Sequence, residues 1–339
     1  MRLLIVAQKV DKNDPVLGFF HQWLEEFAKH CQNVIVICLA KGEYSLSSNI
    51  QVLPLGKESG QSRIKYLANF YKYIWQERNN YDAVFVHMNP EYVVLGGLLW
   101  RAWNKPIGLW YTHKSVNLKL RLALRLSHLI FTASRESFRL KSKKVRITGH
   151  GIDTEFFKPK ERGGSAEFKI ISVGRVSATK NQLSLVKIFA ELSSQTQKLI
   201  TLELIGAPAV DKDKKYLQQI KDFITVQGLG NKIMFLGAIP QRELVKHYQD
   251  ADLLVNLSQT GSLDKDVLEA AACNLDVLTT NEAFQNILPK QYLANNSEPE
   301  IKRALLEKIE RPLGATALRA VIESYHSLPR LIKLIVASF

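Results

Sequence analysis

Short apolar runs alternate with longer amphipathic segments along almost the whole chain. Leu3–Ala7 and Ala83–His87 have the length and the β-branched character of buried strands, whereas Phe19–His30 has the spacing of a helix that covers a sheet. Parallel strands need a crossover of a dozen or more residues, and a helix usually supplies it. The alternation therefore predicts an α/β fold with mostly parallel sheets.

This alternation runs twice, with a polar stretch rich in Gly and Pro at Lys158–Ser165 between the two halves. Strands are expected in the first half at Leu3–Ala7, Val34–Leu39, Gln51–Leu55, Ala83–His87, Ile107–Thr112, Leu129–Ala133 and Val145–Ile147, and in the second at Lys169–Val173, Ile200–Ile205, Lys232–Leu236, Leu253–Asn256 and Val277–Thr279. We expect two doubly wound, Rossmann-like domains at 1–160 and 161–320, and a C-terminal helix within 321–339 that returns to the first domain. Ligands of such sheets bind beyond the carboxyl ends of the strands, so the cleft between two facing sheets is the expected site.

The composition points to a reducing compartment. The three cysteines, Cys31, Cys38 and Cys273, are far apart and form no Cys-x-x-Cys pair, which indicates buried thiols and neither a zinc site nor a disulfide framework. The first apolar run is too short for a signal-peptide core, and the uncharged apolar segment Tyr92–Trp100 is too short to span a bilayer. We expect a cytoplasmic protein without a transmembrane helix.

The net charge of +14 is concentrated in the N-terminal half. Residues 1–160 carry 24 Lys and Arg against 12 Asp and Glu, whereas residues 161–339 carry 22 against 20. This asymmetry suggests an anionic partner for the first half: a membrane surface, a phosphorylated acceptor or nucleic acid. Segments 63–78 and 117–129 interleave cations with aromatic residues or leucines, so they suit either a peripheral contact with anionic lipid or ordinary packing on the sheet. No recognition motif supports nucleic acid.

Gly174, Arg175 and Lys180 follow a predicted strand and precede a helix. Gly174 suits a sharp turn, the Arg175 guanidinium and the Lys180 ammonium suit phosphate oxygens, and the amides at a helix start favour anions. A solvated loop with two cations is the alternative. Further on, Glu269 lies in an otherwise small and apolar helical segment, where it is either an exposed face residue or a buried group, and a buried carboxylate needs partners such as ribose hydroxyls.

Several ordered motifs make the second half similar to the retaining GT-B glycosyltransferases of family 4, also called group 1. The stretches that carry the resemblance, over roughly residues 169–290, are "ISVGRVSATKNQLSLVKIFAEL", "LELIGAP", "KIMFLGAIPQRELVKHYQDADLLVNLSQTGSLDKDVLEAAAC" and "DVLTTN". The resemblance implies that Arg175 and Lys180 grip the diphosphate of a nucleotide-diphospho-sugar donor and act in catalysis. It implies that Glu269 binds the donor ribose. It also places Gly206, Ala238 and Ile239 in segments that border the nucleobase.

One departure from the family pattern concerns the loop before Glu269. The family has a second Glu eight positions earlier, where it contacts the donor sugar, but Gly261 stands there in this chain. The loop continues with Ser262, Leu263 and Asp264, so Ser262 or Asp264 is a candidate for the sugar contact. Other interpretations are a changed donor, a loop that merely varies, or a loss of activity.

The first half contributes candidates for the acceptor side of the cleft. The resemblance implies that His113, after the strand "PIGLWYTH", lies beside the reacting sugar as a catalytic residue, although a loop histidine that caps a helix has the same pattern. The further candidates, all after predicted strands or at a helix start, are Gly18, His21, His87, Asn89 and His150. The segment that contains His150 matches the family's segment at the domain junction. For this residue we favour a role in positioning the backbone over a role in catalysis. The polar loop Gln8–Gly18 resembles the family's glycine loop.

The resemblance implies a retaining, hexosyltransferase-like glycosyltransferase for a hydroxyl acceptor, a saccharide or lipid-linked saccharide, in surface polysaccharide or glycolipid synthesis. The alternative is a nucleotide-sugar-binding module of the same fold that transfers nothing. Three Asp-x-Asp pairs could chelate a metal on a diphosphate. With Arg175 and Lys180 available for that charge, we expect no metal and no cofactor.

Overall fold

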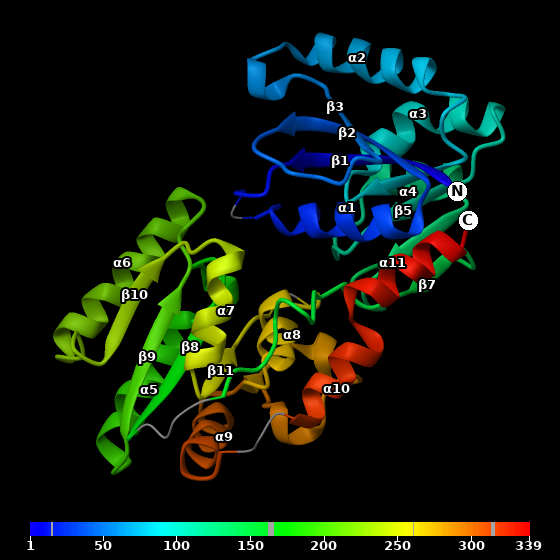
Figure 1. Ribbon diagram of the computed structural model, residues 1–339. Helices are drawn as coiled ribbons and strands as arrows, with labels where there is room; N and C mark the ends of the chain where they lie inside the picture. Colours follow the sequence, from blue (N-terminus) through cyan, green and yellow to red (C-terminus); the bar gives the residue numbers. More distant parts are fainter. Residues whose placement is uncertain (15, 162–165, 260, 313–315) are drawn as a thin grey trace. The chain divides into compact units, whose positions relative to one another are not determined.

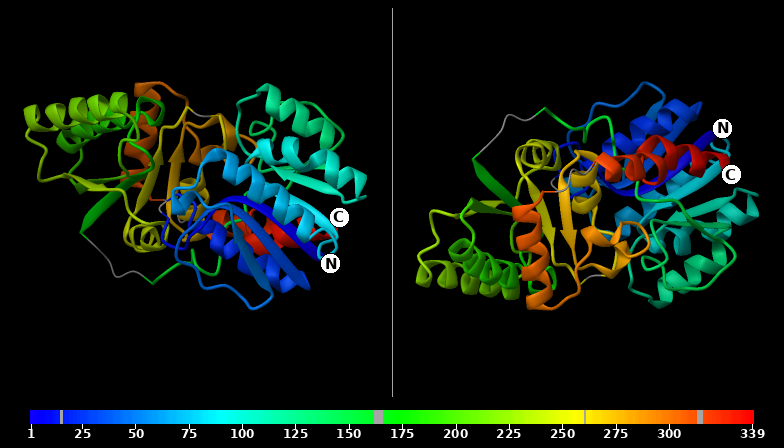
Figure 2. Two further views of the ribbon diagram at one scale, coloured as in Figure 1. Left: turned by 90° about the horizontal axis from the view of Figure 1, so that it is seen from above. Right: turned by 90° about the horizontal axis from the view of Figure 1, so that it is seen from below.

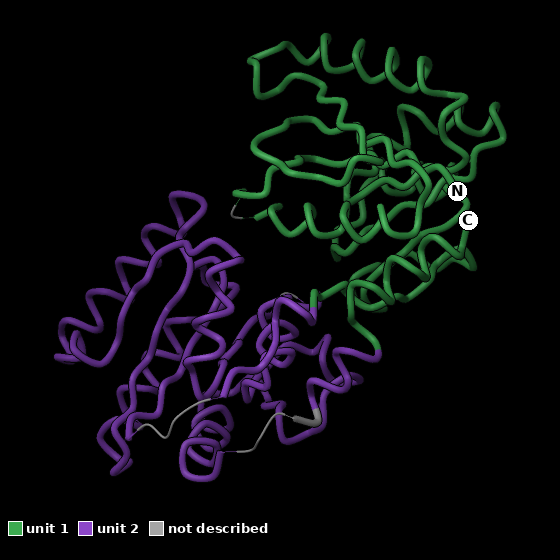
Figure 3. The backbone as a smooth tube through the Cα atoms, in the orientation of Figure 1, with its two compact units in different colours: residues 1–153, 325–339 green, residues 154–324 purple. Residues whose placement is uncertain are grey.

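The computed structural model describes residues 1–14, 16–161, 166–259, 261–312 and 316–339. The chain forms two compact units (Figure 3). Unit 1 comprises Met1–Asp153 and Tyr325–Phe339, and unit 2 comprises Thr154–Ser324. The expected boundaries were residues 160/161 and 320/321. Of the expected linker, Arg162–Ser165 lie outside the described residues.

Unit 1 is built on a seven-stranded parallel sheet with the order β3-β2-β1-β4-β5-β6-β7 (Figure 1). Its strands are β1 (Arg2–Val10), β2 (Asn33–Lys41), β3 (Ile50–Pro54), β4 (Ala83–His87), β5 (Ile107–Trp110), β6 (Leu129–Thr132) and β7 (Val145–Ile147). The expected loop at Gln8–Gly18 is shorter than predicted, because β1 continues to Val10 and pairs with Lys41 of β2 there. β4 is wholly buried, and β1 is buried over its apolar run Leu3–Ala7, as expected for strands in the middle of a sheet that is covered on both faces.

Helices cover both faces of this sheet. The core on one face joins the sheet to α2 (Arg63–Gln76), α3 (Pro90–Ala102) and α4 (Leu118–Leu126). On the other face lie α1 (Phe19–His30) and α11 (Leu328–Ala337), which pack on each other; Figure 2 shows α11 in red beside the blue α1. The starts of α2 and α4 are capped by Ser62 and Asn117, whose side chains accept from backbone amides three residues on, at 3.3 and 2.9 Å.

Unit 2 is built on a five-stranded parallel sheet with the order β10-β9-β8-β11-β12. The strands are β8 (Glu167–Val173), β9 (Leu199–Ile205), β10 (Ile233–Gly237), β11 (Leu253–Asn256) and β12 (Asp276–Thr279). The helices are α5 (Gln182–Gln195), α6 (Asp211–Val226), α7 (Gln241–Asp250), α8 (Lys265–Ala272), α9 (Glu298–Glu310) and α10 (Thr316–Tyr325). Short 3₁₀ turns in the two units lie at Lys57–Ser59, Ala178–Lys180, Glu282–Phe284 and Lys290–Tyr292.

The C-terminal segment differs from the single helix expected within 321–339. The chain forms α10 and then α11, with His326 and Ser327 between them. Ser327 precedes α11 and Pro329 occupies its first turn. Proline is tolerated there but breaks a continuous helix, because its ring clashes with the preceding turn and it lacks the amide hydrogen.

Candidate functional site

The carboxyl edge of the sheet in unit 2 gathers most of the predicted site residues. β8 lies in the middle of this sheet, between β9 and β11. After β8 the chain first adds β9 and β10 on one side and then β11 and β12 on the other. The order of strands therefore reverses between β8 and β11, and the crevice beyond the carboxyl ends of these two strands is the switch point at which such sheets bind ligands. Gly174 and Gly206, directly after β8 and β9, have φ of 135° and 142°. A Cβ on Gly206 would overlap the carbonyl oxygen of Gly174, so glycine is required where these loops approach.

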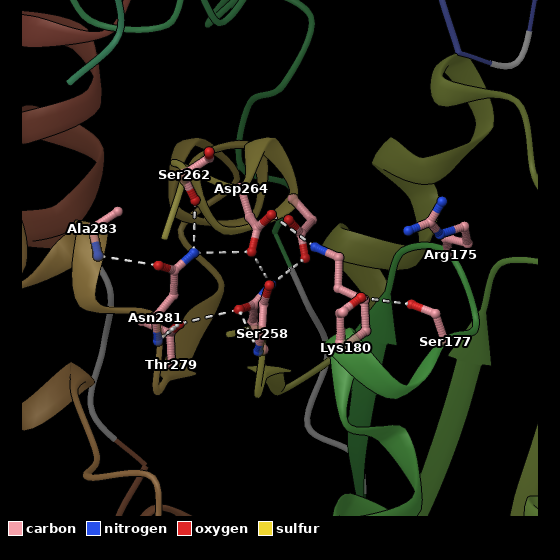
Figure 4. A network of polar contacts seen from close by, with 12 residues as sticks. Arg175, Ser177, Lys180, Ser258, Ser262, Asp264, Thr279, Asn281 and Ala283 are labelled. Carbon is pink, nitrogen blue, oxygen red and sulfur yellow. Dashed lines mark hydrogen bonds and ion pairs between the residues drawn. The ribbon is translucent and has the colours of Figure 1, made fainter. Parts of the chain in front are cut away.

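Lys180 and Asp264 meet at this switch point (Figure 4). The Lys180 ammonium donates to Oδ1 of Asp264 at 2.7 Å, and the two side chains are 18% and 12% exposed. Burial alone would lower the pKa of Lys180, but the nearby carboxylates of Asp266 and Asp264 raise it. Lys180 is therefore a fixed, fully charged cation at the start of α5.

Two asparagines complete the surroundings of Asp264. Asn256 donates from Nδ2 to Oδ2 of Asp264 at 3.2 Å, and to Oδ2 of Asp266 at 2.8 Å. Asn281 donates to the same Oδ2 of Asp264 at 3.1 Å and to the carbonyl oxygen of Ser262 at 2.7 Å. Asp264 thus accepts hydrogen bonds from three side chains, which assigns it to holding Lys180 and the loop in place.

The loop before α8 turns at Gly261, where φ is 63° and the residue is buried. A residue with a side chain is strained in this region of φ, so the position that carries Glu in the family pattern has a backbone role here. Leu263 is buried in the same loop, while Ser262 is partly exposed. Both candidates for a sugar contact, Ser262 and Asp264, are partly exposed.

Arg175 stands apart from the Lys180 network in Figure 4. Its side chain is 55% exposed, and its Nε lies 3.8 Å from Oδ2 of the buried Asp213. Its backbone is held in place, because Gln182 donates to the Arg175 carbonyl at 3.0 Å and accepts from the Ser177 amide at 3.3 Å. The loop is fixed while most of the guanidinium remains available to an anion.

Glu269 is buried on α8, which decides between the two expected settings of this carboxylate in favour of the buried one. Gln241 donates to its Oε1, and the Tyr248 hydroxyl donates to its Oε2 at 3.1 Å. Burial raises the pKa of the Glu269 carboxyl, while the Lys265 ammonium and these donors oppose part of the rise. Each carboxylate oxygen can accept more than one hydrogen bond, so the group retains capacity for a ligand's hydroxyls.

The segments after β9 and β10 reach the same edge. Gly206 donates its amide to the carbonyl of Gly237 at 2.7 Å, which ties the end of β9 to the end of β10. Ala238 and Ile239 follow Gly237 directly, before α7 begins at Gln241. The structure therefore brings Gly174, Arg175, Lys180, Gly206, Ala238, Ile239, Gly261, Ser262, Leu263 and Asp264 to the loops beyond the carboxyl ends of the strands, and Glu269 to the middle of α8, the helix that follows one of these loops.

The predicted residues of unit 1 are more dispersed. His113 is exposed, three residues after the end of β5, and its Nδ1 accepts from the Ser115 amide at 3.1 Å. His87, at the end of β4, is buried in an aromatic cluster, with its ring centroid 4.3 Å from that of Phe20 and 5.4 Å from that of Trp23. Asn89 precedes α3 and donates to the carbonyl of His87 at 3.3 Å.

Gly18, His21 and His150 take part in backbone arrangements of unit 1. A Cβ on Gly18 would lie 2.6 Å from the carbonyl oxygen of Asp14, so the loop before α1 requires a glycine. The buried His21 accepts from the Ser45 amide at 3.2 Å. His150 is also buried, between Gly149 and Gly151, which have φ of 80° and 74°. This setting agrees with a positioning role for its segment.

Several residues that the sequence interpretation missed surround the predicted ones. They are the partners of Glu269, Asp264 and Arg175, namely Gln241, Tyr248, Asn256, Asn281 and Asp213. One signal was available for two of them: Asn256 ends β11, and Asn281 follows β12 by two residues. Polar residues at the ends of neighbouring parallel strands meet at one edge, and this rule identifies the pair.

Across the five described ranges, no group of three or more His, Cys, Asp or Glu side chains is arranged to hold a metal ion. Among the helices of those ranges, none is long and apolar enough to cross a membrane.

Family models match most of the chain. Residues 153–298 match the model of the glycosyl transferases group 1, and residues 14–113 match that of the glycosyl transferase 4-like proteins. The chain belongs to the group 1 glycosyltransferases. A curated relative of this group 1 glycosyltransferase is the mannosylfructose-phosphate synthase of Agrobacterium fabrum, 24% identical over 155 residues and 43% of this chain. The matched region spans about a third of that relative, 34% of its length.

Solved structures show that this group 1 glycosyltransferase has the GT-B fold. Anabaena HepE in complex with UDP and glucose matches with a TM-score of 0.77 and 17% identity, over 100% of this chain and 99% of that one. A sucrose-phosphate synthase from Thermosynechococcus elongatus matches with a TM-score of 0.77 and 15% identity, over 100% and 98%.

Proposed function

We propose that this chain transfers a hexosyl unit from a nucleotide-diphospho-sugar to a hydroxyl acceptor with retention of anomeric configuration. The observation that carries the proposal is the pair of cations in the loop after β8, where the Lys180 ammonium is held by Asp264 and the Arg175 side chain is 55% exposed. Support also comes from the family, and from HepE, which was solved with UDP and with UDP-glucose.

In the proposed reaction, the bond between the sugar C1 and the diphosphate oxygen breaks, and a bond forms between C1 and the acceptor oxygen. The acceptor's proton passes to an oxygen of the leaving diphosphate on the same face of the sugar. Arg175 and Lys180 would stabilise the negative charge that develops on the diphosphate. Glu269 would accept hydrogen bonds from the ribose hydroxyls, and His113 would orient the sugar or the acceptor.

We also propose that the reaction needs no metal and no cofactor. The diphosphate of the donor is negatively charged, and Arg175 and Lys180 would balance this charge directly. We propose a saccharide or lipid-linked saccharide as the acceptor, in surface polysaccharide or glycolipid synthesis. The enzyme would work in the cytoplasm, at the inner face of the membrane.

The test measures release of nucleoside diphosphate from UDP-, GDP- and ADP-sugars by the purified protein, with and without a panel of saccharide acceptors. We expect one donor to be turned over, and Lys180→Ala to lower the rate at least about a hundredfold, as loss of one fixed charge at a developing anion does. Lys187→Ala is the matched control, because Lys187 is exposed on the same helix α5 and should keep full activity. Wild-type rates in Lys180→Ala would contradict the proposal.

A binding module without transferase activity is the second candidate, and Gly261 in place of the family's Glu favours it. The two candidates differ in one result: a module raises its melting temperature with a nucleotide-sugar but releases no diphosphate. Slow hydrolysis of the donor by the wild type, lost in Lys180→Ala, would exclude the module.

A further inference from the structure

Helix α2 has an apolar face that points to solvent in addition to its buried face. Only Phe70 and Ile74 of its 14 residues are buried against the sheet. Ile64, Leu67, Tyr71 and Trp75 are 81%, 41%, 37% and 55% exposed. Their spacing of three or four residues places them on one stripe along the helix. A stripe of this kind on a surface helix has no role in the core of unit 1.

Cations flank this stripe on both sides. At 100° per residue, Lys65 and Lys72 fall on one side of the stripe and Arg63 on the other. The three are exposed, and no acidic residue lies in α2. The guanidinium of Arg78, just beyond the helix, lies 4.8 Å from the ring centroid of Trp75.

The neighbouring helices extend the same surface. The Tyr71 hydroxyl donates to the Leu95 carbonyl of α3 at 3.2 Å, and Trp75 meets Trp103 edge to face at 5.8 Å, so α2 lies beside α3. α3 in turn packs on α4. Leu98 of α3 and Leu118 of α4 are 71% and 70% exposed. The exposed cations of α4 are Lys119, Arg121 and Arg125, and this helix also contains no acidic residue. Lys119 is paired with Glu91 of α3 at 2.9 Å, which leaves Arg121 and Arg125 as the main cations of α4 for lipid phosphates.

We propose that the outer face of α2, α3 and α4 docks on an anionic lipid bilayer. In this account the exposed apolar side chains, led by Ile64 and Trp75, enter the boundary between headgroups and acyl chains, and the flanking cations meet the lipid phosphates. An interfacial helix has this arrangement, with a central apolar stripe, cations at its margins and an aromatic ring at the headgroup level. A single basic patch would attract any polyanion, but exposed aliphatic side chains gain free energy only in an apolar phase.

Charge complementarity decides against a second copy of the chain as the occupant. α2, α3 and α4 together carry seven cations and one acidic residue, Glu91, so a symmetric contact through this face would bring like charges together. An anionic bilayer supplies the opposite charge and an apolar interior at once. The inference concerns unit 1 alone and does not depend on the proposed transferase activity.

Co-sedimentation of the full chain with vesicles tests the proposal. We compare vesicles of phosphatidylcholine with vesicles of equal parts phosphatidylcholine and phosphatidylglycerol, without any nucleotide-sugar. The wild type should bind the anionic vesicles. Ile64→Ser/Trp75→Ser should lower its partition coefficient at least about tenfold, because two apolar side chains leave the lipid. Lys65→Glu/Lys72→Glu should lower it by roughly tenfold or more, since each cation near the surface contributes to binding.

Two matched controls separate this face from general properties of the protein. Lys187→Glu/Lys246→Glu changes the net charge equally through exposed lysines of unit 2, and Val226→Ser removes an apolar side chain that is 79% exposed there. Both should bind vesicles like the wild type. The proposal is wrong if the wild type ignores anionic vesicles, if Ile64→Ser/Trp75→Ser binds normally, or if the unit 2 lysines matter equally. Self-association of the wild type that Ile64→Ser/Trp75→Ser abolishes would also overturn it.

Discussion

The pair of Lys180 and Asp264 gives a quantitative prediction for a double-mutant cycle. The ammonium and the carboxylate are 2.7 Å apart, and their side chains are 18% and 12% exposed. A hydrogen bond to a charged group contributes about 1.5–3 kcal/mol, and breaking a buried ion pair costs up to about 5 kcal/mol. After Lys180→Met, however, Asp264 keeps the amide donors of Asn256 and Asn281. We therefore expect Lys180→Met to cost about 2 kcal/mol, toward the lower end of this range.

Asp264→Asn should lower the free energy of unfolding by about 2–3 kcal/mol. Both oxygens of Asp264 accept hydrogen bonds, so the NH2 group of the new amide must meet a donor, either Lys180 or the two asparagines. In the double variant the two losses overlap, so the coupling energy should be about 1–2 kcal/mol. Urea unfolding of the four proteins, with equal m-values, measures it. Lys302 and Glu191, 2.6 Å apart but 28% and 58% exposed, provide a control cycle with a coupling below about 1 kcal/mol. Equal coupling in both cycles would refute the assignment of Asp264 as the residue that positions Lys180.

Further predictions concern stability. Lys308→Met removes the cation 2.7 Å from Asp276, where both side chains are at most 5% exposed, so unfolding free energy should fall by about 3–5 kcal/mol in urea titrations. Burial lowers the pKa of His326 to about 4 from its usual 6.5. The unfolded chain then binds more protons than the folded one between these pH values. His326 should therefore lower the free energy of unfolding by roughly 3 kcal/mol as the pH falls from 6.5 to 4, and His326→Gln should remove this contribution. Gly206→Ala should abolish nucleotide-sugar binding or folding, because its Cβ would overlap the Gly174 carbonyl; calorimetry and circular dichroism distinguish the two outcomes. A normal affinity in Gly206→Ala would show that the two loops can separate.

The helices and strands were predictable because the spacing of apolar residues differs between a buried strand and a helix that covers a sheet. Ala83–His87 and Phe19–His30 have the predicted bounds. The division of the C-terminal segment was not predicted, although Pro329 marks it. The prediction took the segment as one helix, whereas in the structure α10 ends at Tyr325 and α11 begins at Leu328, directly before the proline.

The site was predictable in its charged members and not in their partners. Lys180 and Glu269 were singled out because a cation suits a phosphate and a carboxylate suits ribose hydroxyls, and because the resemblance implies these roles, which stay predictions. Gln241 and Tyr248 were missed because they reach Glu269 from α7, 28 and 21 residues away, and periodicity does not encode a contact of this kind. For Asp264 the sequence left a sugar contact open, and its three side-chain donors point to a positioning role.

The account rests on a nucleotide-sugar site in unit 2, and calorimetric titration of UDP into wild type and Glu269→Ala tests it most directly. We expect the wild type to bind UDP, or GDP or ADP if the nucleobase differs, and Glu269→Ala to bind at least about tenfold more weakly, as loss of a charged hydrogen-bonding group predicts. Thermal unfolding of Glu269→Ala establishes that it is folded. No binding of any of the three nucleotides to the wild type, or equal affinity in folded Glu269→Ala, would contradict the account.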